Sequence, residues 1–297
     1  MKRKHLLSNS LLGIILMCAG QLSFALNDCI VKFSVQEANN NISVINVIFI
    51  RGLFTTFFIF LYLNIIDKKN IFEILKIKSF HIRGLFEVMT ALFFFTGLIL
   101  MPVSNVYTLL MTNPFFVTIF AFIFLKEKVG IRRWFAVIVG FIGVIIVINP
   151  QNMNISYFFI FPILAAMFLT IRDVRTKGIV TKSNNFEIIF VTSVLMTIFS
   201  GIGSIFFEFS LTLNQLPQIM ISSIFLSIAY LFSVMTIFYA PLSLSASARY
   251  SVVIFGIIFG YLILDEIPTY NMFFGALIII FSGLFVIKRQ KDLGKII

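Results

Sequence analysis

Four ionisable residues fall inside long apolar stretches of the sequence, where they could bind a charged group of a ligand or pair with one another. Asp28 and Arg51 lie in the first two stretches, and Asp173 and Arg249 lie in the sixth and ninth. An ionised side chain inside a bilayer costs a few kcal/mol, so it usually has a partner or lines an aqueous cavity. We predict two ion pairs, Asp28 with Arg51 and Asp173 with Arg249, one in each leaflet. The alternative is that these residues only hold helices together or reach the membrane interface.

Two further polar positions have both a structural and a functional interpretation. Glu87 follows Arg83 by four residues, a spacing that favours an ion pair on one helix face. It is also a candidate proton site, because a carboxyl group in a low dielectric can hold a proton near neutral pH. Asn113 precedes Pro114, which interrupts an apolar stretch. The proline frees a backbone carbonyl that a ligand could use, or it only bends the helix.

Two tyrosines complete the candidate substrate pathway, since an aromatic ring can stack on a flat or cationic substrate. They are Tyr230 and Tyr250, the latter beside Arg249. An interfacial position is the alternative for each. The sequence has no Gly-rich phosphate loop, nucleophile elbow or Cys/His cluster. We therefore expect no catalytic residues, no metal and no cofactor, and no ATP-driven pump without a separate ATPase subunit.

The elements that position these residues are predicted to be membrane-spanning helices. Of the 297 residues, 60% are hydrophobic and 12% are charged, with a mean hydropathy of +1.05, whereas about a quarter of a soluble protein is charged. A helix crosses a bilayer with roughly 20 apolar residues. The pattern predicts an all-α membrane protein of ten transmembrane helices. The predicted spans are 11–33, 43–66, 84–103, 104–125, 133–149, 157–177, 186–207, 218–240, 243–264 and 269–287.

The positive charges predict the orientation of these spans, because short loops rich in Lys and Arg stay in the cytoplasm. With the N-terminus inside, all but three of the 23 Lys and Arg residues fall in cytoplasmic segments. The exceptions are Lys32 at an outer helix end and Arg51 and Arg249 inside spans. We predict a multi-pass protein of the inner membrane with both termini cytoplasmic. The net charge of +11 then reports topology, and we expect no nucleic-acid partner.

An internal repeat divides the chain into residues 1–150 and 151–297. A shift of 139 residues places Pro102 over Pro241 and Glu127 over Glu266, and a shift of 145 places Asp28 over Asp173. Each half holds five predicted helices, so the second half enters the membrane from the opposite side. Such inverted repeats are typical of carriers that alternate between two open states. A G-x-x-x-G in the ninth span, at residues 256–260, favours close packing with its repeat mate or with a second copy in a homodimer.

Residues 82–150 resemble the first repeat of the EamA-type carriers of the drug/metabolite transporter superfamily. The shared features include the pattern E-x-x-x-x-x-x-[WF]-x-[GA], which occurs at Glu127 to Trp134 and again at Glu266 to Phe273. The segment FALNDCIVKF and the R-G-L-F of the second span are similar to members associated with uptake of S-adenosylmethionine or riboflavin. The resemblance implies ten helices and translocation of a metabolite, and it leaves substrate and direction open.

Together these observations predict a secondary transporter, not an enzyme, that moves a small polar metabolite by alternating access. Uptake of a compound like S-adenosylmethionine or riboflavin is the first interpretation, and export of amino acids or metabolites is the second. An intramembrane lipid-modifying enzyme is a remote third. Such an enzyme should gather His and carboxylate residues at one face, whereas here the carboxylates are spread along the spans.

Overall fold

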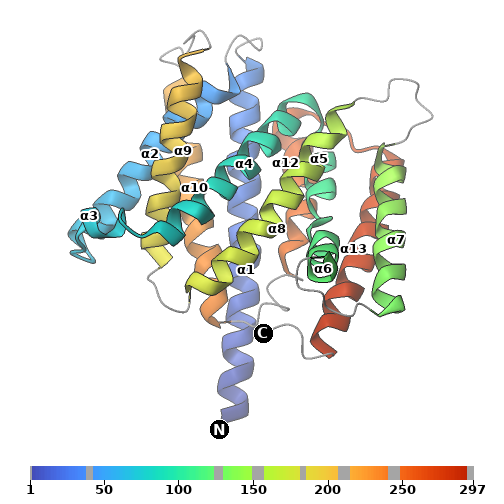
Figure 1. Cartoon of the computed structure of the whole chain (residues 1–297). Helices are drawn as coiled ribbons and strands as arrows, with labels where there is room; N and C mark the ends of the chain where they lie inside the picture. The colour runs from blue at the N-terminus through green and yellow to red at the C-terminus, as the bar shows by residue number, and fades with distance from the viewer. Residues whose placement is uncertain are drawn as a thin grey trace.

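The computed structural model describes residues 2–37, 43–123, 130–148, 157–180, 185–206, 215–239 and 248–292, and these are almost entirely helical (Figure 1). The helices are α1 (Lys2–Glu37), α2 (Val44–Ile65), α3 (Ile71–Ile74), α4 (Lys78–Leu100), α5 (Val103–Leu110), α6 (Asn113–Ile123), α7 (Ile131–Ile148), α8 (Ile160–Val180), α9 (Asn185–Ser204), α10 (Leu216–Tyr239), α12 (Ser251–Leu264) and α13 (Tyr270–Asp292). A 3₁₀ turn at Tyr157–Phe159 precedes α8.

Seven helical segments of the described chain are long and apolar enough to cross a membrane. They are Leu11–Glu37, Val44–Ile65, Lys78–Leu100, Val103–Phe120, Tyr157–Thr176, Asn185–Ser204 and Leu216–Ser233. Three shorter apolar helices cover Trp134–Ile148, Ser251–Leu264 and Tyr270–Val286. Each segment overlaps one predicted span, so the all-α membrane fold is confirmed. The full set of ten spans stays a prediction.

The fourth predicted span is interrupted at Met111 and Thr112, between α5 and α6, and Asn113 and Pro114 begin α6. Because proline has no N–H to donate, a helix continuing through this point would lose a hydrogen bond. Thr112 instead closes α5 with its backbone N–H and its hydroxyl, both of which donate to the Leu109 carbonyl at 3.1 and 2.7 Å. A new helix then begins, and Phe115 donates to the Thr112 carbonyl at 2.9 Å.

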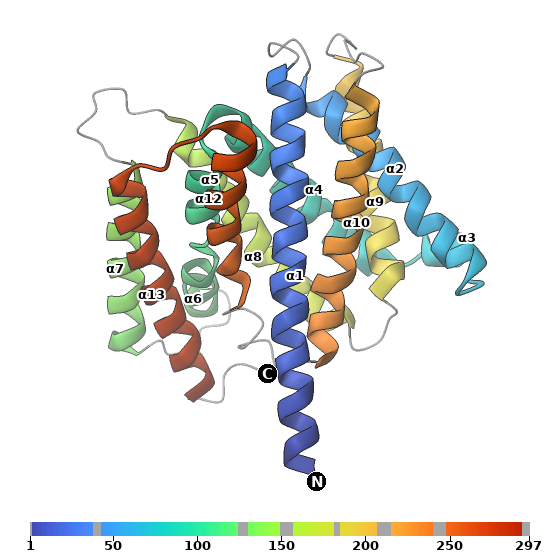
Figure 2. The same ribbon diagram turned by 180° about the vertical axis from the view of Figure 1, so that it is seen from behind.

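The helices pack in pairs that join the two halves of the chain. Helix α1 packs on α10 and α12, and α8 packs on α4 and on the broken pair α5 and α6. Helix α10 also contacts α2, as α4 contacts α9. The other main pairs are α2 with α9, α5 with α12, and α7 with α13. The α7–α13 pair forms one side of the molecule in both views (Figures 1 and 2).

The chain directions of these helices can be followed in Figure 1. Helix α1 runs from the bottom of the view to the top, whereas α8 runs from top to bottom. Helix α2 runs downward and α9 runs upward. A hydrophobic core cluster connects the pairs and draws buried residues from all the described α-helices except α3. A second cluster lies among α2, α3, α9 and the start of α4.

The G-x-x-x-G face of α12 packs within the chain. A Cβ on Gly256 would overlap the ring of Tyr107 in α5, and a Cβ on Gly260 would lie 3.2 Å from a Glu266 carboxylate oxygen. The absence of side chains at these positions allows the two helices to approach closely. Of the two predicted roles for this face, contact with another helix of the same chain is the one present. The homodimer stays a prediction.

Candidate functional site

The charged side chains buried between the helices fall into three groups, which we name by their residues. The Glu87 network contains Arg83, Glu87, Arg172, Asp173 and Arg249. The Asp28 group contains Asp28, Asn27, Arg51 and Tyr107. The third is the ion pair of Lys32 with Glu266. Each joins helices that are distant in sequence, so the fold brings their members together.

Glu87 is the centre of the Glu87 network. Nη1 of Arg172 in α8 donates to both of its carboxylate oxygens, at 3.0 and 2.8 Å. Nη2 of Arg83, one turn earlier on α4, lies 3.0 Å from Oε2, so the predicted pair of Arg83 and Glu87 is confirmed. The hydroxyl of Tyr230 in α10 donates to Oε1 at 3.2 Å. These four contacts fix Glu87 between three helices. The predicted proton role of Glu87 stays a prediction.

Arg172 also binds Asp173, its neighbour in the chain. Its Nη2 and Nε donate to Oδ1 of Asp173 at 2.7 and 3.1 Å. Nη1 of Arg249, which precedes α12, donates to Oδ2 of Asp173 at 2.7 Å. The predicted ion pair of Asp173 and Arg249 is therefore present. Arg172 was not among the predicted site residues, because it was counted with the cytoplasmic charges. Its position next to Asp173 inside an apolar helix was the available signal.

The network carries three guanidinium groups and two carboxylates, so it has one positive charge in excess. Arg83 also donates to the hydroxyls of Thr176 and Thr192, at 3.2 and 2.6 Å. A buried charge is tolerated where it is paired and its remaining donors find acceptors. Arg83 meets this condition through Thr176 of α8 and Thr192 of α9.

The Asp28 group differs from its prediction. Among the described side chains, Asp28 accepts hydrogen bonds from Tyr107 at 2.5 Å and from Asn27 at 2.7 Å, and it has no direct contact with Arg51. Nη1 of Arg51 instead reaches Oδ1 of Asn27 at 3.5 Å. The predicted direct ion pair is therefore wrong, because the Asn27 amide lies between the two charges and bonds to both. Sequence reasoning missed this asparagine, although it is adjacent to Asp28.

Arg51 has few partners for a buried guanidinium. Its side chain is almost fully buried, and its Nε atom has no hydrogen-bond partner. The Cζ atom lies 4.3 Å from the centre of the Phe95 ring, a cation–π contact between α2 and α4. Ser223 of α10 donates to the Arg51 backbone carbonyl at 3.3 Å. Arg51 is thus held by an aromatic ring and one amide, not by a carboxylate.

Lys32 and Glu266 form the third group, with Nζ and Oε1 2.6 Å apart. Nζ also donates to the Met101 carbonyl at 2.6 Å, and the Val103 N–H donates to Oε2 of Glu266 at 2.7 Å. The lysine side chain is 3% exposed and the glutamate 14%. This ion pair connects α1, the junction of α4 and α5, and the end of α12. Lys32 was predicted to lie at an outer helix end, and no partner was predicted for it. Glu127, the predicted counterpart of Glu266, lies outside the described residues.

The remaining predicted site residues have mainly structural contacts. The side-chain amide of Asn113 donates to the Thr170 hydroxyl at 3.0 Å, which attaches the break between α5 and α6 to α8. Tyr230 packs edge-on against Phe24 of α1, with ring centres 5.7 Å apart. Tyr250 is buried with its hydroxyl against Gly283 of α13, and that hydroxyl has no hydrogen-bond partner. Their role in a substrate pathway stays a prediction.

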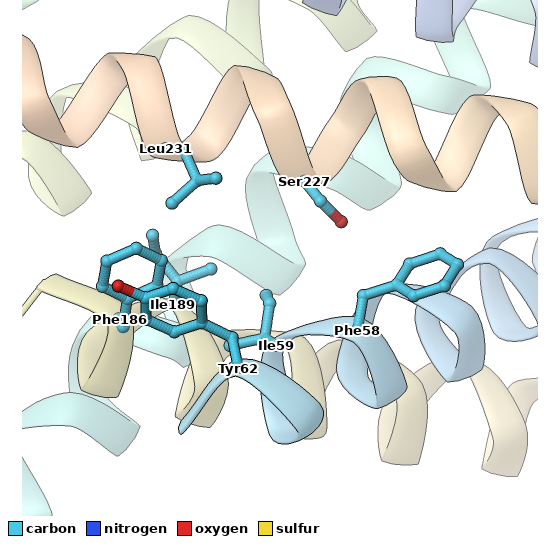
Figure 3. Close-up of a pocket in the computed structure, with 7 residues that line it drawn as sticks. All are labelled: Phe58, Ile59, Tyr62, Phe186, Ile189, Ser227 and Leu231. Carbon is cyan, nitrogen blue, oxygen red and sulfur yellow. The ribbon is translucent and has the colours of Figure 1, made fainter. Parts of the chain in front are cut away.

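A recess of about 160 Å³ lies among α2, α9 and α10 (Figure 3). It is lined by Phe58, Ile59, Tyr62, Phe186, Ile189, Ser227 and Leu231. The rings of Tyr62 and Phe186 stack there with centres 4.0 Å apart. The wall is almost wholly apolar and contains no charged side chain. A polar metabolite needs hydrogen-bond partners to replace its water, so the charged groups are the better candidate site.

Comparison with known proteins shows which transporters this chain is similar to. Residues 11–149 match the model of the EamA-like transporter family. The S-adenosylmethionine uptake transporter of Rickettsia bellii is 26% identical over 195 residues, which cover 66% of this chain and 67% of that protein. The riboflavin transporter of Brucella anthropi is 28% identical over 200 residues, covering 65% and 70%. These alignments span roughly two thirds of each relative's length.

Two further matches extend over most of the chain. The pseudopaline exporter CntI of Pseudomonas aeruginosa is 19% identical over 286 residues, covering 94% of this chain and 97% of that protein. A crystal structure that shares 12% sequence identity superposes with a TM-score of 0.57 over 90% of this chain and 96% of its own. At this identity the structural match shows the fold alone.

The apolar helices and the transporter relatives define the chain as a multi-pass membrane transporter, and not an enzyme. Within that class, residues 11–149 are an EamA-like transporter domain of the drug/metabolite transporter superfamily. The resemblance drawn from the sequence is confirmed.

Proposed function

We propose that this protein is a secondary carrier of the inner membrane that takes up a small polar metabolite of the S-adenosylmethionine or riboflavin kind. The observation that carries the proposal is the Glu87 network, because its five ionised side chains lie among apolar helices from both halves of the chain. Such residues mark substrate or ion pathways in membrane proteins. The names of the relatives supply the substrate classes.

We further propose that the chain consists of two inverted repeats of five spans, residues 1–150 and 151–297, with both termini in the cytoplasm. The helix pairing supports this. If α1, α2, α4, α5–α6 and α7 correspond to α8, α9, α10, α12 and α13, the main contacts between different helices have counterparts. The contact of α1 with α10 corresponds to that of α8 with α4, and the contact of α10 with α2 corresponds to that of α4 with α9. The opposite directions of α1 and α8, and of α2 and α9, support the inversion.

In this arrangement the two halves move against each other around the buried charges. Asp28 and Asp173 each precede the end of their helix by about two turns. Because α1 and α8 run in opposite directions, the two residues lie toward opposite sides of the membrane. We place Asp28 and Arg51 along the outer half of the pathway, and Asp173, Arg249 and Tyr230 along the inner half.

Asn113 and Tyr250 complete the proposed pathway at its edge. The break that Asn113 attaches to α8 lets α5 and α6 tilt separately, and Tyr250 follows Arg249 directly in the chain. The Lys32–Glu266 pair closes the outer end by binding α1 to α12 and to the α4–α5 junction. Opening of that end requires the pair to separate.

Export is the alternative direction, and one observation favours it. The relative that aligns over nearly the whole chain is named an exporter, whereas the alignments with the uptake relatives cover about two thirds of it. An alternating-access carrier works in either direction according to the gradients imposed on it. The direction is therefore decided by measurement.

The test is uptake of radiolabelled S-adenosylmethionine and riboflavin by a bacterial host that expresses the full chain. We expect one of the two compounds to accumulate above the empty-vector level. Arg249→Ala should lose that uptake, since it removes a charge from the proposed pathway. Arg175→Ala is the matched control, because Arg175 is an exposed arginine on α8 two residues from Asp173, and it should retain uptake.

Absence of uptake of both compounds, with the protein detected in the membrane, would overturn the uptake proposal. Host cells preloaded with each labelled compound then test export. Faster loss of label from expressing cells than from vector controls would establish the alternative direction.

A further inference from the structure

The Asp173–Arg249 pair is the most accessible ion pair of the Glu87 network. The Asp173 side chain is 29% exposed and that of Arg249 is 21% exposed, whereas Arg83, Glu87 and Arg172 are 9%, 8% and 14% exposed. A ligand that enters between the helices therefore meets this pair before it meets the others. The remaining charges of the network lie behind it.

The two partners are anchored very differently. Oδ1 of Asp173 is held by two donors of Arg172, and Arg172 is itself held by both oxygens of Glu87. Arg249 makes a single hydrogen bond to the described part of the chain, through Nη1 to Oδ2 of Asp173. A guanidinium has five N–H donors, so most of those on Arg249 have no partner among the described residues. When the pair separates, Asp173 stays in place and Arg249 is released.

Separation exposes two opposite charges that lie 2.7 Å apart in the closed pair. Arg249 then has no carboxylate partner among the described residues, and Oδ2 of Asp173 has no donor although Oδ1 keeps Arg172. Both losses are costly between apolar helices. A neutral ligand replaces neither of the lost ionic contacts, and a simple anion or cation replaces only one. A ligand with a carboxylate and an ammonium group on the same carbon compensates both, since its carboxylate replaces Asp173 at Arg249 and its ammonium replaces Arg249 at Asp173.

We propose that Asp173 and Arg249 bind the zwitterionic head group of an α-amino acid or of a compound that carries one. Arg249 takes the carboxylate, in the paired hydrogen-bond geometry that a guanidinium favours. Asp173 takes the ammonium through Oδ2, while Arg172 and Glu87 position it. No bond is made or broken in this exchange of ion pairs.

This inference rests on the proposed function and narrows its substrate class. S-adenosylmethionine carries an α-amino acid head group, whereas riboflavin does not. The geometry therefore favours substrates that resemble the first compound. It also applies to free amino acids and to other metabolites with this head group, whichever direction they move.

Binding to the purified full-length protein in detergent tests the inference without requiring transport. Apparent affinities come from the ligand dependence of thermal stabilisation. The probes are S-adenosylmethionine, S-adenosylhomocysteine, decarboxylated S-adenosylmethionine and riboflavin. S-adenosylhomocysteine keeps the head group but lacks the sulfonium charge, and the decarboxylated compound lacks only the carboxylate. We expect the two zwitterionic probes to bind, and the decarboxylated compound to bind at least about tenfold more weakly than S-adenosylmethionine.

Two variants test whether the preference for the carboxylated compound depends on Arg249. Arg249→Gln should reduce the preference for the carboxylated compound to less than about twofold, and Arg175→Gln should leave it unchanged. Equal binding of the carboxylated and decarboxylated compounds by the unmodified protein would overturn the inference. Stabilisation by riboflavin alone, or by no zwitterionic probe, would overturn it as well. If the protein binds the zwitterions but the host cells neither accumulate nor release them, the proposed function fails and the inference stands.

Discussion

The Lys32–Glu266 pair yields a quantitative prediction for stability. The glutamate carboxylate is the only charged group that the described structure places against the Lys32 ammonium, and the lysine is 3% exposed. Glu266→Gln removes that charge and leaves Lys32 with neutral acceptors. Removing one partner of a buried pair costs about 3–5 kcal/mol. We expect about 3 kcal/mol, at the lower end, because Lys32 keeps the Met101 carbonyl and the new amide can accept from Val103.

The assay is thermal unfolding of the purified protein in detergent, followed by circular dichroism. At roughly 2–4 °C per kcal/mol for a chain of this order of size, the midpoint should fall by roughly 6–12 °C. Adding Lys32→Met removes the charge that Glu266→Gln leaves unpaired. The double variant should therefore be more stable than Glu266→Gln alone, because replacement of a whole buried pair is often nearly neutral.

An ion pair with an exposed lysine supplies the control. Lys69 and Glu187 lie 3.5 Å apart, with the lysine 50% and the glutamate 12% exposed. Pairs that solvent reaches contribute about 0–1 kcal/mol, and loss of this glutamate leaves a solvated ammonium group, not a buried one. Glu187→Gln should shift the midpoint by only a few degrees. If Glu266→Gln shifts it no more than Glu187→Gln, the buried pair does not hold the helices together. If the double variant loses the sum of both single losses, the two residues are not energetically coupled, and the reasoning fails in the same way.

Three further predictions concern the other buried contacts and use the same unfolding assay. Gly256→Ala should lower the free energy of unfolding by about 1–3 kcal/mol, because the added Cβ would overlap the Tyr107 ring. Gly130→Ala is the control and should lower it far less, since a Cβ on Gly130 has no neighbour within 4 Å. Equal losses would contradict the close approach of α12 and α5. Tyr107→Phe should cost about 1.5–3 kcal/mol, since it removes a hydrogen bond to the Asp28 carboxylate, and an unchanged midpoint would show that this bond is absent. Arg172→Gln should lower the free energy of unfolding by about 3–5 kcal/mol, because Glu87 and Asp173 each lose an ion-pair partner. A loss no larger than that of Arg175→Gln would show that Arg172 does not hold the Glu87 network together.

The helices of the fold could be predicted from the sequence because each apolar stretch can be compared separately with the length needed to cross a bilayer. The pairing of Asp173 with Arg249 could be predicted as well, since a charge inside an apolar helix requires a partner and these two residues were available at similar depth. The break before Pro114 followed from the missing N–H of proline. Each of these predictions depends on local chemistry.

The contacts that were missed depend on how helices pack. Asn27 separates Asp28 from Arg51 because of the positions of side chains on α1 and α2, which the spacing of charges does not contain. Lys32 finds Glu266 only when α1 packs against α12. Arg172 was grouped with loop charges because a span boundary is uncertain by a few residues, yet one turn of helix decides whether its guanidinium meets water or Glu87.

The three charged groups differ in one physical respect that bears on transport. Lys32 and Asp28 are almost fully buried, so neither exchanges its partner for a ligand unless helices move apart. Asp173 and Arg249 are paired directly but are partly exposed, and Arg249 has a single hydrogen bond to the described residues. An ion pair of this kind can exchange a partner without leaving a buried charge uncompensated. The groups that hold the helices together are therefore distinct from the pair that can bind a ligand, and substitutions can separate the two effects.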